Sequence, residues 1–169
     1  ELLIVKGETK DSLVIADNGF LFHTVDSKSK DSLSLQIRNY TRFNFLAKLE
    51  IRDPLYDLDI KLIPVINGVA DTSMKYQKSV NGIPEFTDKD IVQIWVKNNT
   101  DHGVYLNILD IQPDGLINPV FPNTRKGIQK EDLFVKPGRG GLFENYKIKL
   151  TGPPFGMEIF KIFVAESMI

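Results

Sequence analysis

The side chains in this chain that are most suited to catalysis are its two histidines. They lack the cysteine with which a histidine forms a nucleophilic pair. The chain contains His23 and His102 but no cysteine, which excludes a Cys-His catalytic pair. His102 follows Asp101 in the polar stretch 98–103, where a solvated turn residue is the ordinary interpretation. His23 follows an apolar run and is expected at a surface or rim. No serine lies in a G-x-S-x-G motif, and we predict no catalytic residues.

Two groups of aspartates offer carboxylates for a metal ion or for acid–base chemistry. They are Asp53, Asp57 and Asp59, and Asp88, Asp90 and Asp101. Carboxylates that converge from loops suit Ca²⁺, which takes about 6–8 oxygen ligands. The chain has no D-x-[DN]-x-[DN]-G loop with a distal Glu, and Asp is a preferred turn residue. We interpret these residues as solvated turn aspartates and predict no metal and no cofactor. A carboxylate-dependent hydrolase is kept as an alternative.

Aromatic residues offer a different kind of site. Trp95, Tyr105 and Phe121 are able to form an exposed platform for carbohydrate or peptide, but a β-sandwich also needs large residues between its sheets. Core packing is therefore the default interpretation, and the sequence leaves open which face of its sheet Trp95 occupies. The candidate ligand surface consists of Trp95 and Tyr105 together with Asp101 and His102.

The segment 137–141 (PGRGG) is rich in glycine and contains a basic residue, a composition that suits anion binding through backbone N–H groups. It lacks the G-x-x-x-x-G-K-[ST] pattern and precedes a strand instead of a helix. A flexible hairpin loop is the favoured interpretation.

Composition narrows the class of protein. The chain has 169 residues, of which 42% are hydrophobic and 25% charged, an ordinary globular balance. The formal net charge of −1, with basic and acidic residues well mixed, disfavours nucleic acid as a partner and gives no polybasic patch for a membrane. No apolar run reaches the roughly 18 residues of a transmembrane segment. The first residue is Glu1, and we expect the chain to be the C-terminal part of a longer protein.

The elements that must position these residues are mostly strands. Asn-Gly between apolar runs predicts an N-terminal hairpin or three-strand meander over residues 2–22. Apolar residues at spacings of three and four predict one helix over 31–49, begun by Ser29, Asp31 or Ser32 and stopped at Asp53-Pro54. Further strands are predicted at 58–66, 91–97, 104–111, 116–121, 132–135, 142–150 and 157–165. Residues 67–86 are expected to form a long, mobile connection with a short strand near 73–78.

Short strands with turn signals about every ten residues are typical of a β-sandwich. We predict a mostly β fold, an antiparallel, Ig-like β-sandwich with one N-terminal helix and a small N-terminal hairpin. The predicted domains are 1–56, the hairpin and helix packing on the main domain, and 57–169, the β-sandwich.

Several turn motifs occur in an order that resembles a known family. They are the segments 97–101 (KNNTD), 112–115 (QPDG), 121–123 (FPN), 152–156 (GPPFG) and 158–164 (EIFKIFV). Over about residues 57–169, this pattern resembles a bacterial domain of unknown function. That domain is found C-terminal to caspase-like, metacaspase-type peptidase domains. The helix and the segment after it are similar to the connection that precedes this domain in some of those proteins.

The resemblance implies an accessory role. We expect a non-catalytic domain of a multidomain bacterial protein that binds or positions polypeptide, with the parent peptidase domain or another protein as its partner. Such a domain would belong to a bacterial protein, with a preference for a periplasmic or extracellular location. A module that binds glycan or cell envelope through Trp95 is the first alternative.

Overall fold

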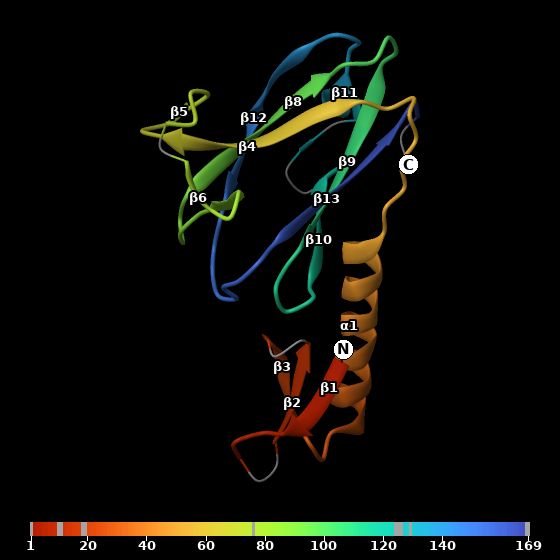
Figure 1. The fold of residues 1–169 in the computed structure, drawn as a ribbon, viewed down its shortest axis with the longest axis vertical. Coiled ribbons are helices and arrows are strands. Elements are labelled where there is room, and N and C mark those ends of the chain that lie inside the picture. Colours follow the sequence, from red (N-terminus) through yellow and green to blue (C-terminus); the bar gives the residue numbers. More distant parts are fainter. Residues whose placement is uncertain are drawn as a thin grey trace. The chain divides into compact units, whose positions relative to one another are not determined.

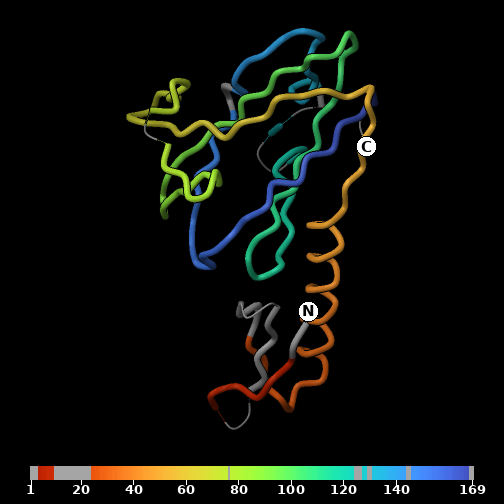
Figure 2. The backbone as a smooth tube through the Cα atoms, in the orientation of Figure 1, coloured from red at the N-terminus to blue at the C-terminus, as the bar shows by residue number. Residues whose placement is uncertain are grey.

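The computed structural model in Figure 1 describes residues 2–9, 12–17, 20–75, 77–123, 127–128 and 130–167. Figure 2 follows the backbone from the N-terminal to the C-terminal end. The fold is mostly β, with antiparallel, sandwich-like sheets and one α-helix, as the sequence predicts. The chain forms two compact units, which are described separately. The first consists of residues 1–51, 108–121 and 154–162, and the second of residues 52–107, 122–153 and 163–169. The domain boundary at 56/57 stays a prediction.

The first unit begins with a three-stranded antiparallel sheet, which confirms the predicted N-terminal hairpin. Its strands are β1 (Leu2–Lys6), β2 (Ser12–Asp17) and β3 (Phe20–Asp26), in the order β1-β2-β3. The predicted Asn18-Gly19 turn lies outside the described residues.

The predicted helix is confirmed as α1 (Lys30–Lys48). It begins after Ser29, whose hydroxyl accepts a hydrogen bond from the Ser32 backbone N–H at 3.3 Å and so satisfies one free donor of the first turn. Tyr40 is buried with Val25 of β3, which ties the helix to the small sheet. The helix ends at Lys48, several residues before the predicted stop at Asp53-Pro54.

Near its C-terminal end, α1 also receives a contact from β13 (Ile159–Ala165). Lys161 Nζ donates a hydrogen bond to the Ala47 backbone carbonyl, with 3.2 Å between the two atoms. A cation at this position offsets the negative end of the helix dipole and satisfies a carbonyl that has no partner within the helix. No local sequence pattern indicates this pairing, because the two residues are far apart along the chain.

The second unit contains a four-stranded sheet in the order β12-β8-β4-β5. Its strands are β4 (Leu58–Ile66), β5 (Val69–Ala70), β8 (Ile91–Asn98) and β12 (Gly140–Lys149). The central strand β8 pairs antiparallel with β4 on one side and with β12 on the other. Its alternate residues Val92, Ile94 and Val96 are each almost completely buried and form the core on one face.

The segment expected to be a long connection instead contains two tight hairpins. Asn67 and Gly68 join β4 to β5, and Asn81 and Gly82 join β6 (Lys78–Val80) to β7 (Ile83–Glu85). All four turn residues have φ between 51° and 83°, the left-handed values that a type I′ turn requires. Ser73 lies in a turn, so the short strand begins at Lys78, later than expected.

A second sheet has the order β10-β9-β11, and β13 also pairs with β9. Its strands include β9 (Val104–Ile111), β10 (Ile117–Phe121) and β11 (Phe134–Val135), which follows the 3₁₀ turn η2 (Lys130–Leu133). In the second unit, β11 pairs with the start of β9 through Phe134–Tyr105 and Val135–Val104. In the first unit, β10 pairs with the end of β9, with Asn118 opposite Asp110.

Candidate functional site

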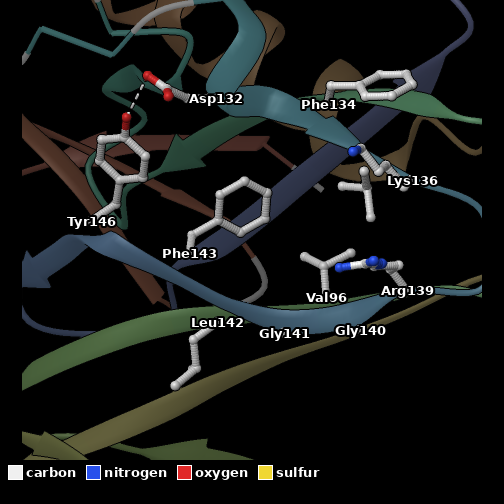
Figure 3. Close-up of a pocket in the computed structure, with 11 residues that line it drawn as sticks. Val96, Asp132, Phe134, Lys136, Arg139, Gly140, Gly141, Leu142, Phe143 and Tyr146 are labelled. Atoms are coloured by element: carbon white, nitrogen blue, oxygen red, sulfur yellow. Dashed lines mark hydrogen bonds between the residues drawn. The ribbon is translucent and has the colours of Figure 1, made fainter.

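A pocket opens between β11 and β12 in the second unit. It has a volume of about 380 Å³ and is lined by residues from β8, η2, β11, β12 and the turn that joins β11 to β12 (Figure 3). β11 is an edge strand of one sheet and β12 an edge strand of the other, and the residues 136–139 join them. The pocket is the space left between these two edges.

Two adjacent glycines in β12 line the pocket. A Cβ atom at Gly140 would lie 3.1 Å from Lys97 Cβ and 3.3 Å from Trp95 Cζ2, too close for an ordinary contact. Gly141 is paired with Val96, and a Cβ atom there would meet nothing within 4 Å. Successive residues of a strand face opposite sides, so Gly140 faces Trp95 while Gly141 leaves open space over Val96, which lines the pocket.

A bulge in β12 supplies the aromatic wall of the pocket. The pairing with β8 shifts between Leu142 and Lys147, so the residues between them are not in regular register. Figure 3 shows Phe143 and Tyr146 within this bulge, on the side that faces Asp132 and Phe134. The bulge therefore turns two aromatic side chains toward the pocket.

A hydrogen bond closes one end of the pocket. Tyr146 Oη donates to Asp132 Oδ2 at 2.7 Å and so joins β12 to η2 (Figure 3). Asp132 raises the pKa of Tyr146, because the hydrogen bond to the carboxylate favours the protonated phenol. The Asp132 carboxylate gives this end a negative charge.

The opposite end of the pocket is basic. Lys136 and Arg139 flank the Pro137-Gly138 turn, and the Arg139 backbone N–H donates to the Lys136 carbonyl at 3.3 Å. Gly138 has a φ of 63°, which fits the third position of a type II turn with proline before it. The charged ends of Lys136 and Arg139 lie on the same side of the pocket in Figure 3. Neither side chain has a hydrogen-bond or ion-pair partner within the described part of the chain.

The buried amide of Asn98 fixes the base of this turn. Asn98 is fully buried, and its Nδ2 donates to the carbonyls of His102 at 2.8 Å and Val135 at 3.2 Å. Its Oδ1 accepts hydrogen bonds from the Thr100 backbone N–H and hydroxyl. The Asn98 backbone N–H donates to the Arg139 carbonyl. One side chain thus connects β8, the following turn and β11.

Asp101 and His102 are brought together, as their sequence positions suggest. His102 Nδ1 lies 3.1 Å from Asp101 Oδ1, and the His102 ring packs edge-on against Tyr56. The hydrogen bond to His102 lowers the pKa of Asp101. The Asp101 carboxylate is exposed, whereas His102 is mostly covered, so this pair is a turn with a partly buried ring. His23 lies in β3, and its side chain is outside the described part of the structure.

The aromatic residues of the predicted platform do not share one surface. Phe121 is 1% exposed and belongs to the core, so it cannot contribute to an exposed site. Trp95 is half-buried on the same face of the β12-β8-β4 sheet as Lys61, whose Nζ lies 5.3 Å from the ring centroid. Tyr105 belongs to the other sheet and packs against Phe134, with 5.0 Å between ring centroids.

The predicted aspartate groups act mainly in turns. Asp53 Oδ1 accepts from the Leu55 N–H, Asp90 Oδ2 from the Thr87 N–H and Asp88 Oδ1 from the Gly152 N–H. Asp59 Oδ2 instead accepts from the Asn99 side chain. Across the residues that the structure describes, no three His, Cys, Asp or Glu side chains are grouped so that they could hold a metal ion.

A pair of half-buried acids in the first unit had not been predicted. Asp110 of β9 and Glu158, just before β13, both have raised pKa values, mainly because burial disfavours the charged form. The negative charge of Asp110 raises the pKa of Glu158 further. Asp110 Oδ2 accepts a hydrogen bond from Gln112 Nε2, while Asp110 Oδ1 is buried without a hydrogen-bond partner in the described structure.

One long edge of the four-stranded sheet is open. β4 pairs with β8 from Leu58 to Pro64, but on its other side its only partner among the described residues is the two-residue strand β5. The Asp71 N–H donates to the Pro64 carbonyl, so Pro64 faces the β5 side. Alternate residues point their backbone groups to the same side, and Leu58, Ile60 and Leu62 therefore direct theirs to the open edge. Proline is tolerated on such an edge because no ladder N–H is lost.

Comparison with known proteins finds no match to a family model, a curated protein or a solved structure. No helix among the described residues is long and apolar enough to cross a membrane.

Proposed function

We propose that this chain is a non-catalytic accessory module of a multidomain bacterial protein and that it binds polypeptide by strand addition. The observation that carries the proposal is the edge of β4. From Leu58 to Leu62, no described strand pairs with it on the side away from β8. An extended peptide beside this edge would complete a backbone hydrogen-bond ladder, a recurrent mode of peptide recognition.

The side chains of β4 fit such a role. Leu58, Ile60 and Leu62 are half-buried, while Asp59 and Lys61 between them are exposed. Charged residues on an edge strand discourage indiscriminate self-association of edges. A bound strand would therefore form hydrogen bonds with the main-chain groups along the edge. It would also lie beside Asp59 and Lys61, which favours a peptide with a basic and an acidic residue at the matching positions.

The decisive variant is Leu62→Pro. The Leu62 N–H points away from β8, so proline at this position removes a donor that the sheet does not use. Pro64, two residues later, has its backbone nitrogen on the same side and is already tolerated there. Lys61→Pro is the matched contrast, because the Lys61 N–H faces β8 and its loss should destabilise the sheet itself. We expect Leu62→Pro to remain folded and to lose peptide binding.

Binding is measured on the full chain with a labelled library of extended heptapeptides, and hydrogen exchange then locates the peptide. The proposal expects the amides of Leu58, Ile60 and Leu62 to gain protection when peptide is bound. Peptide binding that leaves these amides exchanging at the free rate, or that survives in Leu62→Pro, contradicts strand addition at β4.

That the chain is non-catalytic can be tested separately from peptide binding. The absence of cysteine and of a G-x-S-x-G motif supports it, and the resemblance to a peptidase-associated domain would imply that catalysis belongs to a separate domain of a parent protein. Peptidase and esterase assays on the isolated chain should give no turnover. Turnover that disappears on His102→Ala would show that the chain is an enzyme.

Glycan binding is a second candidate because Trp95 lies on the sheet face shared with Lys61 and is half-exposed. Aromatic rings of this kind supply an apolar surface with a polar edge. Lys61 covers part of the ring, so Lys61→Ala should strengthen glycan-array binding and Trp95→Ala should abolish it. If neither change alters binding to any glycan, this candidate is wrong.

A further inference from the structure

The pocket between β11 and β12 is distinct from the β4 edge, and its two ends carry opposite charges. Lys136 and Arg139 form its basic end, while Asp132, held by Tyr146, forms the acidic end (Figure 3). Phe134, Phe143 and Val96 lie between them. A ligand that fits all three regions carries a negative group at one end and an apolar group in the middle.

The basic end has the chemistry of an anion site. Lys136 and Arg139 come from the two ends of one tight turn, and neither side chain is neutralised by a partner among the described residues. Guanidinium groups bind carboxylates through two parallel hydrogen bonds, and such charge-assisted bonds are about twice as strong as neutral ones. The Asp132 carboxylate repels an anion at the other end, so the ligand can enter in one orientation only.

The neighbouring strand edge indicates that the ligand is a polypeptide. The Arg139 carbonyl faces β8, because it accepts from the Asn98 N–H. By alternation Gly140 and Leu142 direct their backbone groups to the outer edge of β12, where the described residues provide no further strand. An extended chain along this edge can use those groups while its side chains enter the pocket.

We propose that the pocket between β11 and β12 binds an extended polypeptide segment in which an acidic residue adjoins an aliphatic one. The acidic side chain pairs with Arg139 and Lys136, and the aliphatic side chain fills the space over Val96 that Gly141 leaves empty. The volume of about 380 Å³ lies in the range of known ligand pockets.

Gly141→Leu is the sharpest test of the pocket. The backbone of Gly141 is not in the left-handed region, and a Cβ atom there meets no neighbour within 4 Å, so a side chain can start at this position and extend toward the pocket. We expect an unchanged thermal midpoint and loss of binding. Arg139→Gln should weaken binding by about tenfold, the effect of one charged hydrogen bond. Lys149→Gln is the matched control, because Lys149 is an exposed basic residue of β12 outside the pocket.

The probe is an acetylated, amidated hexapeptide with a central Leu-Glu pair, titrated into the full chain and followed by the NMR shifts of the Gly141 and Phe143 amides. The Leu-Gln version should bind about tenfold more weakly, and Leu62→Pro in β4 should leave binding unchanged. Hexanoate supplies a free carboxylate with an apolar tail and should bind far more weakly than the peptide.

The proposal is overturned if the hexapeptide fails to shift these amides at millimolar concentration. It is also overturned if Gly141→Leu and Arg139→Gln bind the hexapeptide as the unmodified chain does. Hexanoate that binds as tightly as the peptide would identify a small carboxylate as the ligand and would exclude the polypeptide.

Discussion

Asn98 Nδ2 donates a hydrogen bond to the Val135 carbonyl at 3.2 Å, and this contact joins strands that belong to different sheets. Asn98 is 0% exposed, yet both ends of its amide are satisfied. Buried polar groups of this kind are costly to leave unpaired, so a fully satisfied amide fixes one arrangement of the chain around it. Here that arrangement includes the turn at the basic end of the pocket.

Asn98→Leu should lower the free energy of unfolding by about 3 kcal/mol, because the substitution leaves the Val135 carbonyl and the Thr100 N–H buried without this partner. Urea unfolding of the variant measures the change. Asn99→Ala is the control, since Asn99 is exposed and its side chain bonds only to Asp59 at the surface. A loss below 1 kcal/mol for Asn98→Leu would mean that water replaces the amide.

Gly103→Ala should displace the Phe134 ring, since a Cβ atom at Gly103 would overlap Cζ at the far end of that ring. We expect a destabilisation of about 1–2 kcal/mol, the usual cost of overpacking. Phe134→Leu shortens the obstructing side chain, so the cost of Gly103→Ala should fall in that background. A double-mutant cycle by thermal unfolding detects this coupling, and additive effects of the two substitutions would show that the residues do not press on each other.

The stability of the first unit should depend on pH through Asp110 and Glu158. Burial raises the pKa of both carboxyls in the folded chain, so the folded state takes up protons at a higher pH than the unfolded state does. The contribution of these two carboxyls to stability is therefore lowest at neutral pH and rises as the pH falls through the raised pKa values. The gain is complete once the pH is below the ordinary carboxyl pKa of the unfolded chain.

Asp110→Asn tests this dependence, because it removes the buried charge and also its effect on Glu158. The variant should be at least as stable as the unmodified chain at pH 7 and should show a flatter stability profile between pH 7 and 4. Asp114→Asn is the matched control, since Asp114 affects Asp110 only through its charge and should alter the profile less. An unchanged slope in Asp110→Asn would contradict the assignment.

Ser29→Ala should destabilise α1 by about 1 kcal/mol, since it removes the side chain that accepts from the Ser32 N–H. Circular dichroism at 222 nm during thermal unfolding follows the helix directly. Ser29→Asp restores an acceptor and places a negative charge at the positive end of the helix dipole, so it should recover the lost stability. A loss that Ser29→Asp leaves unchanged would indicate a role for Ser29 other than capping.

The sequence predicted elements whose signals are local. The spacing of Leu33, Ile37 and Tyr40 identified α1, and the apolar alternation from Leu58 identified β4 with its bounds. The Asn67-Gly68 and Asn81-Gly82 pairs carried the signal for hairpins, but the strands beside them are only two or three residues long. Such strands leave too little alternation to recognise.

Local sequence patterns do not predict the candidate site. The pocket depends on two strand edges from different sheets and on a bulge near Phe143, none of which has a sequence signature. The segment around Arg139 stands out in the sequence by its glycines and its positive charge, but these features favour a flexible hairpin loop. The raised pKa values of Asp110 and Glu158 likewise arise from burial in the folded chain.

The two adjacent glycines of β12 differ in how much substitution they allow. A Cβ atom at Gly140 would press on Lys97 and Trp95, so a side chain there requires these neighbours to shift. A Cβ atom at Gly141 would meet no neighbour within 4 Å, so a substitution there can change the shape of the pocket without that adjustment. Of these two positions, 141 is therefore the one at which the chain can vary with the smaller effect on the sheet.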